Sequence, residues 1–185
     1  FELLGDVYTL PVAGGRAQPL LTGRAFQSQP RFSPSGTQLV YISDESGSDN
    51  VWIANADGSA PRQITTLPRA GMLSPVWTTD GRAIVVTVTA PYTTRTAELW
   101  RYEVATGQAT RLLENGNGPA QPLVSAPAPG PYGAVPSRDG QSLWFTSVTP
   151  RPYGSRNGPT SAILRLPAAG GAPAPVTVDG MPAMK

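Results

Sequence analysis

The stretch PRFSPSGTQLVYISDESGSDNVWIANADGSAPRQIT, Pro30–Thr65, contains the pattern that decides the fold. Two short runs within it, Gln38–Ile42 and Asn50–Ala54, are rich in the apolar and β-branched residues that are typical of β-strands. A predicted tight turn with Gly36 precedes the first run, and another with Gly58 follows the second. Glycine supplies the positive φ that such hairpin turns need. The stretch therefore predicts short antiparallel strands joined by tight hairpins.

This order of strands and turns recurs along the chain. A first series of turns has glycine at Gly36, Gly81 and Gly140, which are 45 and 59 residues apart. A second series interleaves with the first, and its turns are Val12–Gly15, Ala56–Gly58, Ala105–Gly107 and Ala168–Gly171. Each unit thus has four strands, a to d, with one hairpin between a and b and another between c and d. Four antiparallel strands in a repeat of this length are typical of a β-propeller blade.

The predicted fold is all-β: a β-propeller built of four-stranded antiparallel blades that forms an incomplete ring of about three and a half blades. The predicted divisions are a half blade at 1–23, blades at 24–67, 68–115 and 116–178, and the start of a next blade at 179–185. Because a closed propeller needs about four blades or more, we expect this segment to belong to a larger propeller or to an assembly. Apolar faces exposed on the end blades would favour self-association.

The amino-acid composition excludes several classes of fold and of function. The chain contains 20 Gly and 21 Pro among 185 residues, which excludes long helices. Its only lysine is Lys185, and its arginines are spread along the chain, so no nucleic-acid partner is expected. The absence of His and Cys removes Ser-His-Asp and Cys-His triads and His-ligated zinc. No apolar run approaches the length of a membrane span. We therefore assign no catalytic residue, no cofactor and no membrane span.

Pro30–Thr65 resembles the WD-like repeat of TolB-type bacterial β-propellers. Pro75–Leu113 and Ala134–Val178 resemble it less closely, while Gly5–Gly15 and Ser161–Gly171 are similar to the third strand and c–d turn of the same family. The family includes TolB, a periplasmic protein-binding scaffold, and the N-terminal propellers of prolyl-oligopeptidase-like peptidases and of some amidohydrolases. The resemblance implies a periplasmic or secreted, non-catalytic binding module. The alternative that it implies is an accessory or gating domain of a hydrolase whose catalytic domain lies outside this chain.

Extra length falls in the b–c and d–a connections, which share one face of a propeller, whereas the hairpin turns stay short. Insertions on a single face often mark the binding face of a repeat protein. Tyr and Arg are favoured interface anchors, although each residue alone is also explained as part of a solvated turn. The candidates for contact with a protein or peptide partner, or with the remaining domain of the same parent chain, are Tyr92, Arg95, Tyr132, Arg151, Tyr153, Arg156 and Asn157.

The densest acidic stretch is Asp44–Asp49, which lies at a predicted b–c hairpin. Closely spaced carboxylates such as Asp44 and Asp49 could hold a hard cation such as calcium. The stretch lacks the EF-hand spacing, and Asp, Ser and Gly also suit the geometry of a turn. We therefore favour the turn interpretation and assign no metal site.

Four tryptophans occupy similar positions within predicted strands: Trp52, Trp77, Trp100 and Trp144. One interpretation is a stacking platform for sugars or bases. Packing between blades explains the same positions more simply, because large aromatic side chains dominate apolar interfaces. We therefore expect these side chains to lie between neighbouring blades.

Overall fold

The computed structural model describes residues 1–89, 97–113, 130–149, 160–178 and 181–182. Every regular element in these ranges is a β-strand, which confirms the predicted all-β class. Within the same ranges there is accordingly no helix long and apolar enough to cross a membrane.

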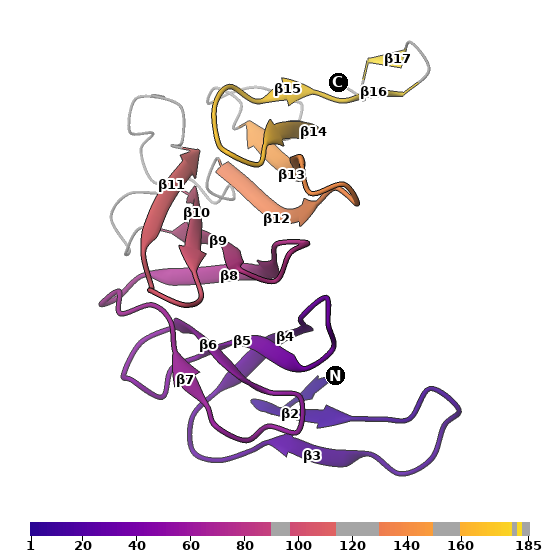
Figure 1. Cartoon of the computed structure of the whole chain (residues 1–185), viewed down its shortest axis with the longest axis vertical. Coiled ribbons are helices and arrows are strands. Elements are labelled where there is room, and N and C mark those ends of the chain that lie inside the picture. Colours follow the sequence, from indigo (N-terminus) through magenta and orange to yellow (C-terminus); the bar gives the residue numbers. More distant parts are fainter. Residues whose placement is uncertain (90–96, 114–129, 150–159, 179–180, 183–185) are drawn as a thin grey trace, which may run out of the picture.

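Three four-stranded antiparallel sheets follow one another along the chain (Figure 1). Sheet II contains β4 (Gln27–Phe32), β5 (Gln38–Ser43), β6 (Asn50–Asn55) and β7 (Arg62–Gln63). Sheet III contains β8 (Gly71–Trp77), β9 (Ala83–Thr89), β10 (Ala97–Glu103) and β11 (Ala109–Leu113). Sheet IV contains β12 (Gly130–Pro136), β13 (Ser142–Thr149), β14 (Thr160–Pro167) and β15 (Ala174–Pro175). In each sheet the spatial order follows the chain order, so the four strands correspond to the predicted strands a to d.

The two ends of the chain differ from the expected pattern. Sheet I at the N-terminus has three strands, β1 (Glu2–Leu3), β2 (Asp6–Thr9) and β3 (Gln18–Leu21), because a two-residue strand is too short to show alternation in the sequence. Strand d of the predicted blade at 116–178 is divided in the structure. β15 pairs with β14, whereas β16 (Thr177–Val178) pairs with β17 (Met181–Pro182). Within the described residues sheets I and IV lie at opposite ends of the stack (Figure 1), in agreement with the predicted incomplete ring.

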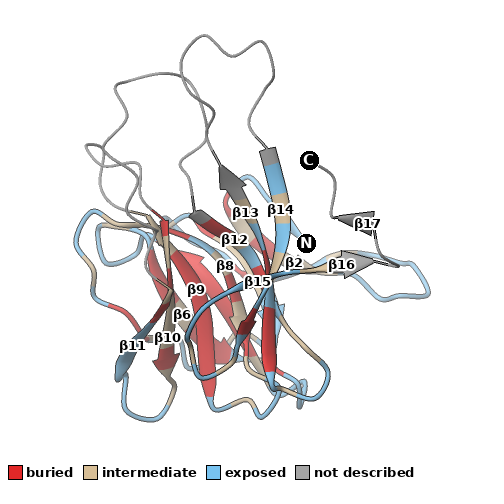
Figure 2. Ribbon diagram, turned by 90° about the horizontal axis from the view of Figure 1, so that it is seen from above, coloured by how far each residue is buried: buried red, intermediate tan, exposed pale blue. Residues whose placement is uncertain are grey.

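The core consists of three apolar clusters that lie between the sheets. Because side chains alternate across a strand, sheets II and III each pack one face on the preceding sheet and the other on the following sheet. In β5, Leu39 packs toward sheet I and Val40 toward sheet III. In β9, Ile84 packs toward sheet II and Val85 toward sheet IV. Figure 2 shows the buried residues concentrated in the middle of the stack of sheets.

Strand a of each four-stranded sheet carries a β-bulge with a residue in the left-handed conformation. These residues are Gln29, Ser74 and Gly133, with φ of 55°, 54° and 62°. Only glycine adopts this conformation without strain, so the two other positions need compensating contacts. Ser74 N donates to Gln29 Oε1 at 2.6 Å, and Gln29 N donates to Glu2 Oε2 at 2.6 Å. Each of these bonds joins a bulge to the preceding sheet.

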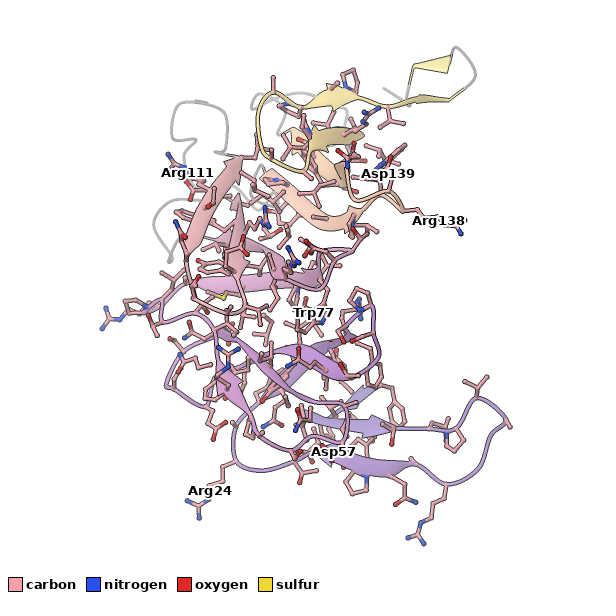
Figure 3. All side chains as sticks on the ribbon, viewed as in Figure 1. Arg24, Asp57, Trp77, Arg111, Arg138 and Asp139 are labelled. Carbon is pink, nitrogen blue, oxygen red and sulfur yellow. The ribbon has the colours of Figure 1, made fainter. Side chains whose placement is uncertain are left out.

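Tryptophan packing follows the order of the sheets. Trp77 is buried between sheets II and III, and its Nε1 donates to Arg31 O at 3.1 Å (Figure 3). Trp52 and Trp100 are half-buried against the clusters on the side of the preceding sheet. Trp144 is 40% exposed and differs from the expectation, because its face of sheet IV has no neighbouring sheet in the described structure.

Thr87→Val is expected to lower the free energy of unfolding by about 1–2 kcal/mol, measured by urea denaturation in dilute solution. Thr87 Oγ1 donates to Pro131 O at 2.9 Å in the buried contact between sheets III and IV, and valine would leave this carbonyl unpaired. The equivalent residue in β13 is Thr146, which is exposed, so Thr146→Val should change stability by less than about 0.5 kcal/mol. Equal losses in the two variants would contradict the assignment of the buried bond.

Candidate binding face and turn-edge groove

The a–b and c–d turns meet at one edge of the sheets, named the turn edge, which contains residues 10–17, 33–37, 56–61, 78–82, 104–108, 137–141 and 168–173. A backbone hydrogen bond joins the two turns in each four-stranded sheet. The bonds are Ala56 N to Thr37 O (2.9 Å), Val104 N to Arg82 O (2.9 Å) and Ala168 N to Gln141 O (3.0 Å). In Figure 2, β10 runs toward this edge and β13 runs away from it.

The b–c and d–a connections meet at the opposite edge, named the loop edge, whose described parts are residues 4–5, 22–26, 44–49 and 64–70. Asp44 Oδ1 accepts a hydrogen bond from Phe26 N at 2.7 Å and so links a b–c loop to a d–a connection. The buried Asn50 side chain makes a second link, because it donates to Ser48 O at 3.1 Å and accepts from Leu67 N at 2.9 Å. The described connections at the loop edge are therefore anchored to one another.

Among the seven predicted contact residues, Tyr132 lies in the described part of the chain. It belongs to strand β12, opposite Thr146 and beside the bulge at Gly133, so it is a strand residue rather than a loop residue. Its side chain is half-buried, and burial raises the pKa of its phenol. The other six residues lie outside the described ranges: Tyr92, Arg95, Arg151, Tyr153, Arg156 and Asn157.

The acidic loop between β5 and β6 has the contacts of a turn. Asp44 accepts the backbone bond from Phe26, and burial together with the Asp44 charge raises the pKa of Asp49. Within the described residues, no group of three or more carboxylates, histidines or cysteines is placed to hold a metal ion. Gly47 N donates to Asp44 O at 2.7 Å, the hydrogen bond that closes a β-turn, and this contact supports the turn interpretation of the loop.

A groove of about 280 Å³ opens at the turn edge between sheets III and IV. Its polar walls include Asp80 and Asp139 from two a–b turns and Arg101 from β10; Figure 3 shows Asp139 at the β12–β13 turn. No pattern in the sequence predicted this groove. The feature of the sequence that marks the groove is Arg101. Arg101 pairs with Val85 in sheet III, and at the equivalent position in sheet II Ile53 pairs with Val40. A charged residue therefore stands between sheets III and IV where the preceding pair of sheets has an apolar one. This equivalence emerges only when the strand register is known.

Each charged group of the groove has a partner in its own turn or strand. Asp80 Oδ1 accepts hydrogen bonds from Thr78 Oγ1 at 2.6 Å and from Arg82 N at 3.1 Å. These bonds, and then the charges of Arg82 and Arg101, hold the pKa of Asp80 below its usual range. Arg101 Nη2 lies 2.9 Å from Glu103 Oε1. The carboxylate of Asp80 therefore serves the turn as an acceptor, and the groove is a polar surface without an evident acid–base pair among its described residues.

Asp80→Asn is expected to lower stability by less than about 1 kcal/mol at pH 7, because the group is exposed. The folded-state pKa of Asp80 is depressed. Its contribution is therefore fully present above the unfolded value of about 3.9 and is lost as the pH falls through the folded pKa. The difference between wild type and variant should shrink below about pH 4 in thermal denaturation curves recorded from pH 7 to pH 2. A difference that does not change with pH would contradict this role.

Solved structures show the same arrangement of sheets. The putative TolB from Agrobacterium tumefaciens has a TM-score of 0.68 and 21% sequence identity, over 95% of this chain and 56% of that chain. The fold is a TolB-like β-propeller. Sheets II, III and IV are therefore propeller blades, and the groove lies between two consecutive blades. No protein-family model matches the chain.

Sequence relatives of the propeller are found among peptidases and TolB proteins. The uncharacterized peptidase YuxL from Bacillus subtilis is 36% identical over 84 residues, which are 45% of this chain and 13% of the relative. A TolB homolog from Chlorobium chlorochromatii is 34% identical over 82 residues, which are 44% of this chain and 18% of the relative. The chain thus spans less than a fifth of these two curated relatives.

Proposed function

We propose that the chain is a non-catalytic segment of a larger β-propeller, which binds a protein or peptide through its loop edge. The observation that carries this proposal is the distribution of connection lengths. The a–b turns contain five residues each and the c–d turns five to eight, whereas the loop-edge connections range from two residues at 4–5 to sixteen at 114–129. Connections of variable length on a rigid scaffold are where binding residues concentrate.

The anchors at the loop edge support the same proposal. Asp44 and Asn50 tie the described connections at 22–26, 44–49 and 64–70 to one another and to strand β6, so this described part of the edge offers a preformed surface. Preformed surfaces bind with a smaller loss of conformational entropy than mobile ones. Tyr and Arg side chains contributed by the connections would then act as contact residues. The proposed contact residues are Tyr92, Arg95, Tyr132, Arg151, Tyr153, Arg156 and Asn157.

A second role is favoured by the likeness to the peptidase YuxL. In this role the parent protein is a hydrolase, and the propeller orients or gates substrate for a catalytic domain outside these residues. The loop edge would then contact the substrate or the neighbouring domain. The likeness to TolB proteins further supports a periplasmic or secreted location for either role.

The purified 185-residue chain is expected to show no turnover of ester, peptide or amide substrates. The groove carboxylate Asp80 is engaged by its own turn, and the chain contains no His or Cys to form a nucleophile–base pair of the common kinds. Chromogenic esters and fluorogenic peptides provide the assay. Turnover that co-purifies with the folded chain and is lost on unfolding would contradict the non-catalytic role.

Binding at the loop edge is tested with an array of immobilised oligopeptides. The variant Tyr92→Ala/Arg95→Ala/Tyr153→Ala is expected to bind the recognised peptides at least tenfold more weakly than the wild type, since Tyr and Arg are frequent hot-spot residues. The matched control at the turn edge is Arg82→Ala/Arg138→Ala, which removes two exposed cations and should retain binding. Equal weakening in the two variants, or loss only in the control, would contradict the proposal.

A further inference from the structure

The groove at the turn edge between sheets III and IV exists because two large apolar side chains of the preceding interface are replaced. Between sheets II and III the equivalent space is filled by Ile53 and Trp77, each 3% exposed. Strand register places Arg101 at the position of Ile53 and Pro136 at that of Trp77. Because proline is much smaller than tryptophan, and Arg101 brings a charge in place of an apolar side chain, the space becomes a groove of about 280 Å³ with a polar wall.

Two carboxylates line the groove from equivalent a–b turns, Asp80 in sheet III and Asp139 in sheet IV. Asp139 Oδ1 accepts hydrogen bonds from Ser137 Oγ at 2.5 Å and from Gln141 N at 3.0 Å. Such bonds within the turns hold the pKa of both carboxyl groups below the usual range, so both are ionised at neutral pH. Among the described residues, neither Oδ2 atom has a hydrogen-bond partner. Each turn therefore leaves one charged acceptor available at the groove.

Arg101 contributes a hydrogen-bond donor to the same groove. Its Nη2 lies 2.9 Å from Glu103 Oε1, but its buried Nε has no hydrogen-bond partner within the described ranges. A buried N–H without an acceptor costs free energy, so a ligand that supplies an acceptor to this atom gains by binding here. The buried side chains of Val85 and Leu143 add an apolar part to the groove wall.

The charges around the groove restrict the class of ligand. The carboxylates of Asp80 and Asp139 disfavour an anion. The guanidinium groups of Arg82, Arg101 and Arg165 are close enough to lower the pKa of these carboxyl groups, so they also disfavour a cation. A hydroxyl group, in contrast, both donates to a carboxylate oxygen and accepts from an N–H, and hydrogen bonds to charged groups are the stronger ones. The groove is slightly smaller than the roughly 300–1,000 Å³ of sites for drug-sized ligands, which indicates a small ligand.

We propose that this groove binds an uncharged polyhydroxylated ring of the size of a monosaccharide. Its hydroxyl groups donate to Asp80 Oδ2 and Asp139 Oδ2 and accept from Arg101 Nε, while a C–H face of the ring lies on Val85 and Leu143. A free sugar and the end of a glycan present the same hydroxyl groups. The inference is independent of binding at the loop edge, which lies at the opposite edge of the sheets.

Titration of the ¹⁵N-labelled chain with glucose, galactose and mannose, followed by NMR, tests the proposal. At least one of these sugars should bind with millimolar affinity and shift the Arg101 Nε–H signal together with the backbone amides of residues 79–81 and 139–141. Glucosamine and glucuronate add a cation and an anion to the same ring, and both should bind more weakly than the best neutral sugar. Equal binding of its methyl glycoside would support the end of a glycan as the source, and weaker binding would support the free sugar.

Variants test the three contacts with a matched control. Asp139→Asn keeps the Oδ1 acceptor of the turn but loses the charged Oδ2, so it should weaken sugar binding about tenfold. Arg101→Lys keeps the positive charge but lacks the Nε–H, and it should weaken binding by a similar factor. The control is Asp57→Asn, because Asp57 Oδ1 accepts from Ser59 N at 3.0 Å in a c–d turn of sheet II, and it should bind like the wild type.

Backbone signals outside the groove should stay unchanged in each variant, which shows that the fold is retained. Three results would overturn the proposal. These are unchanged groove signals with all three sugars at about 100 mM, tighter binding of either charged derivative, and wild-type affinity in Asp139→Asn.

Discussion

Gly58→Ala should lower the free energy of unfolding by about 3 kcal/mol, measured by urea denaturation, because two costs combine at this position. Gly58 adopts φ of 83° in the c–d turn of sheet II, where an alanine costs about 1 kcal/mol. A Cβ on residue 58 would also overlap the backbone carbonyl oxygen of Leu20 in β3. This carbonyl belongs to a paired strand, so the overlap can be relieved only by separating sheets I and II.

Gly36→Ala is the matched control for this substitution. Gly36 has a similar φ of 73°, but a Cβ there would meet no atom within 4 Å. The expected loss of unfolding free energy is therefore only the cost of holding an alanine at positive φ, about 1 kcal/mol. Gly107→Ala should resemble the control, because its Cβ would lie 3.9 Å from Ile64 O. Equal destabilisation by Gly58→Ala and Gly36→Ala would contradict the close contact between the turn at Gly58 and strand β3.

Asn50→Ala should lower the free energy of unfolding by about 3 kcal/mol, because it removes the buried side chain that joins the loop-edge connections at 44–49 and 64–70. Asn50 Oδ1 accepts hydrogen bonds from Thr65 Oγ1 at 2.8 Å and from Leu67 N at 2.9 Å, and the truncation leaves both donors without this acceptor. The variant also lacks the hydrogen bond that the Asn50 side-chain amide donates to Ser48 O. Urea denaturation measures the loss, and limited proteolysis within residues 44–49 should become faster.

Asn55→Ala is the control for the loss of an asparagine amide. The exposed Asn55 side chain donates to Ser59 Oγ at 2.9 Å within the c–d turn of the same sheet. Water can replace that bond, so the variant should lose less than about 1 kcal/mol. Proteolysis of residues 44–49 should stay at the wild-type rate in this control. Unchanged stability in Asn50→Ala would refute the role of Asn50 as the anchor of the loop edge.

The candidate binding residues show the limits of prediction from the sequence. Tyr132 was proposed as a contact residue of the loop face, yet it lies within strand β12, opposite Thr146 and beside the bulge at Gly133. The groove with Asp80, Arg101 and Asp139 was not expected at all. Arg101 and Asp139 come from different sheets, and no local pattern in the sequence brings them together.

The sequence alone determined the strands, the hairpin turns and the repeat. Gly36, Gly81 and Gly140 adopt φ of 73°, 67° and 71°, as the predicted turns require, because a tight turn is decided within a few consecutive residues. Only the tertiary structure decided the left-handed Ser74, whose backbone N–H bonds to Gln29 of the preceding sheet. It also decided which apolar faces have a neighbour and which, as at Trp144, do not. These features depend on contacts between residues that are distant in sequence, so they emerge only when the sheets pack together.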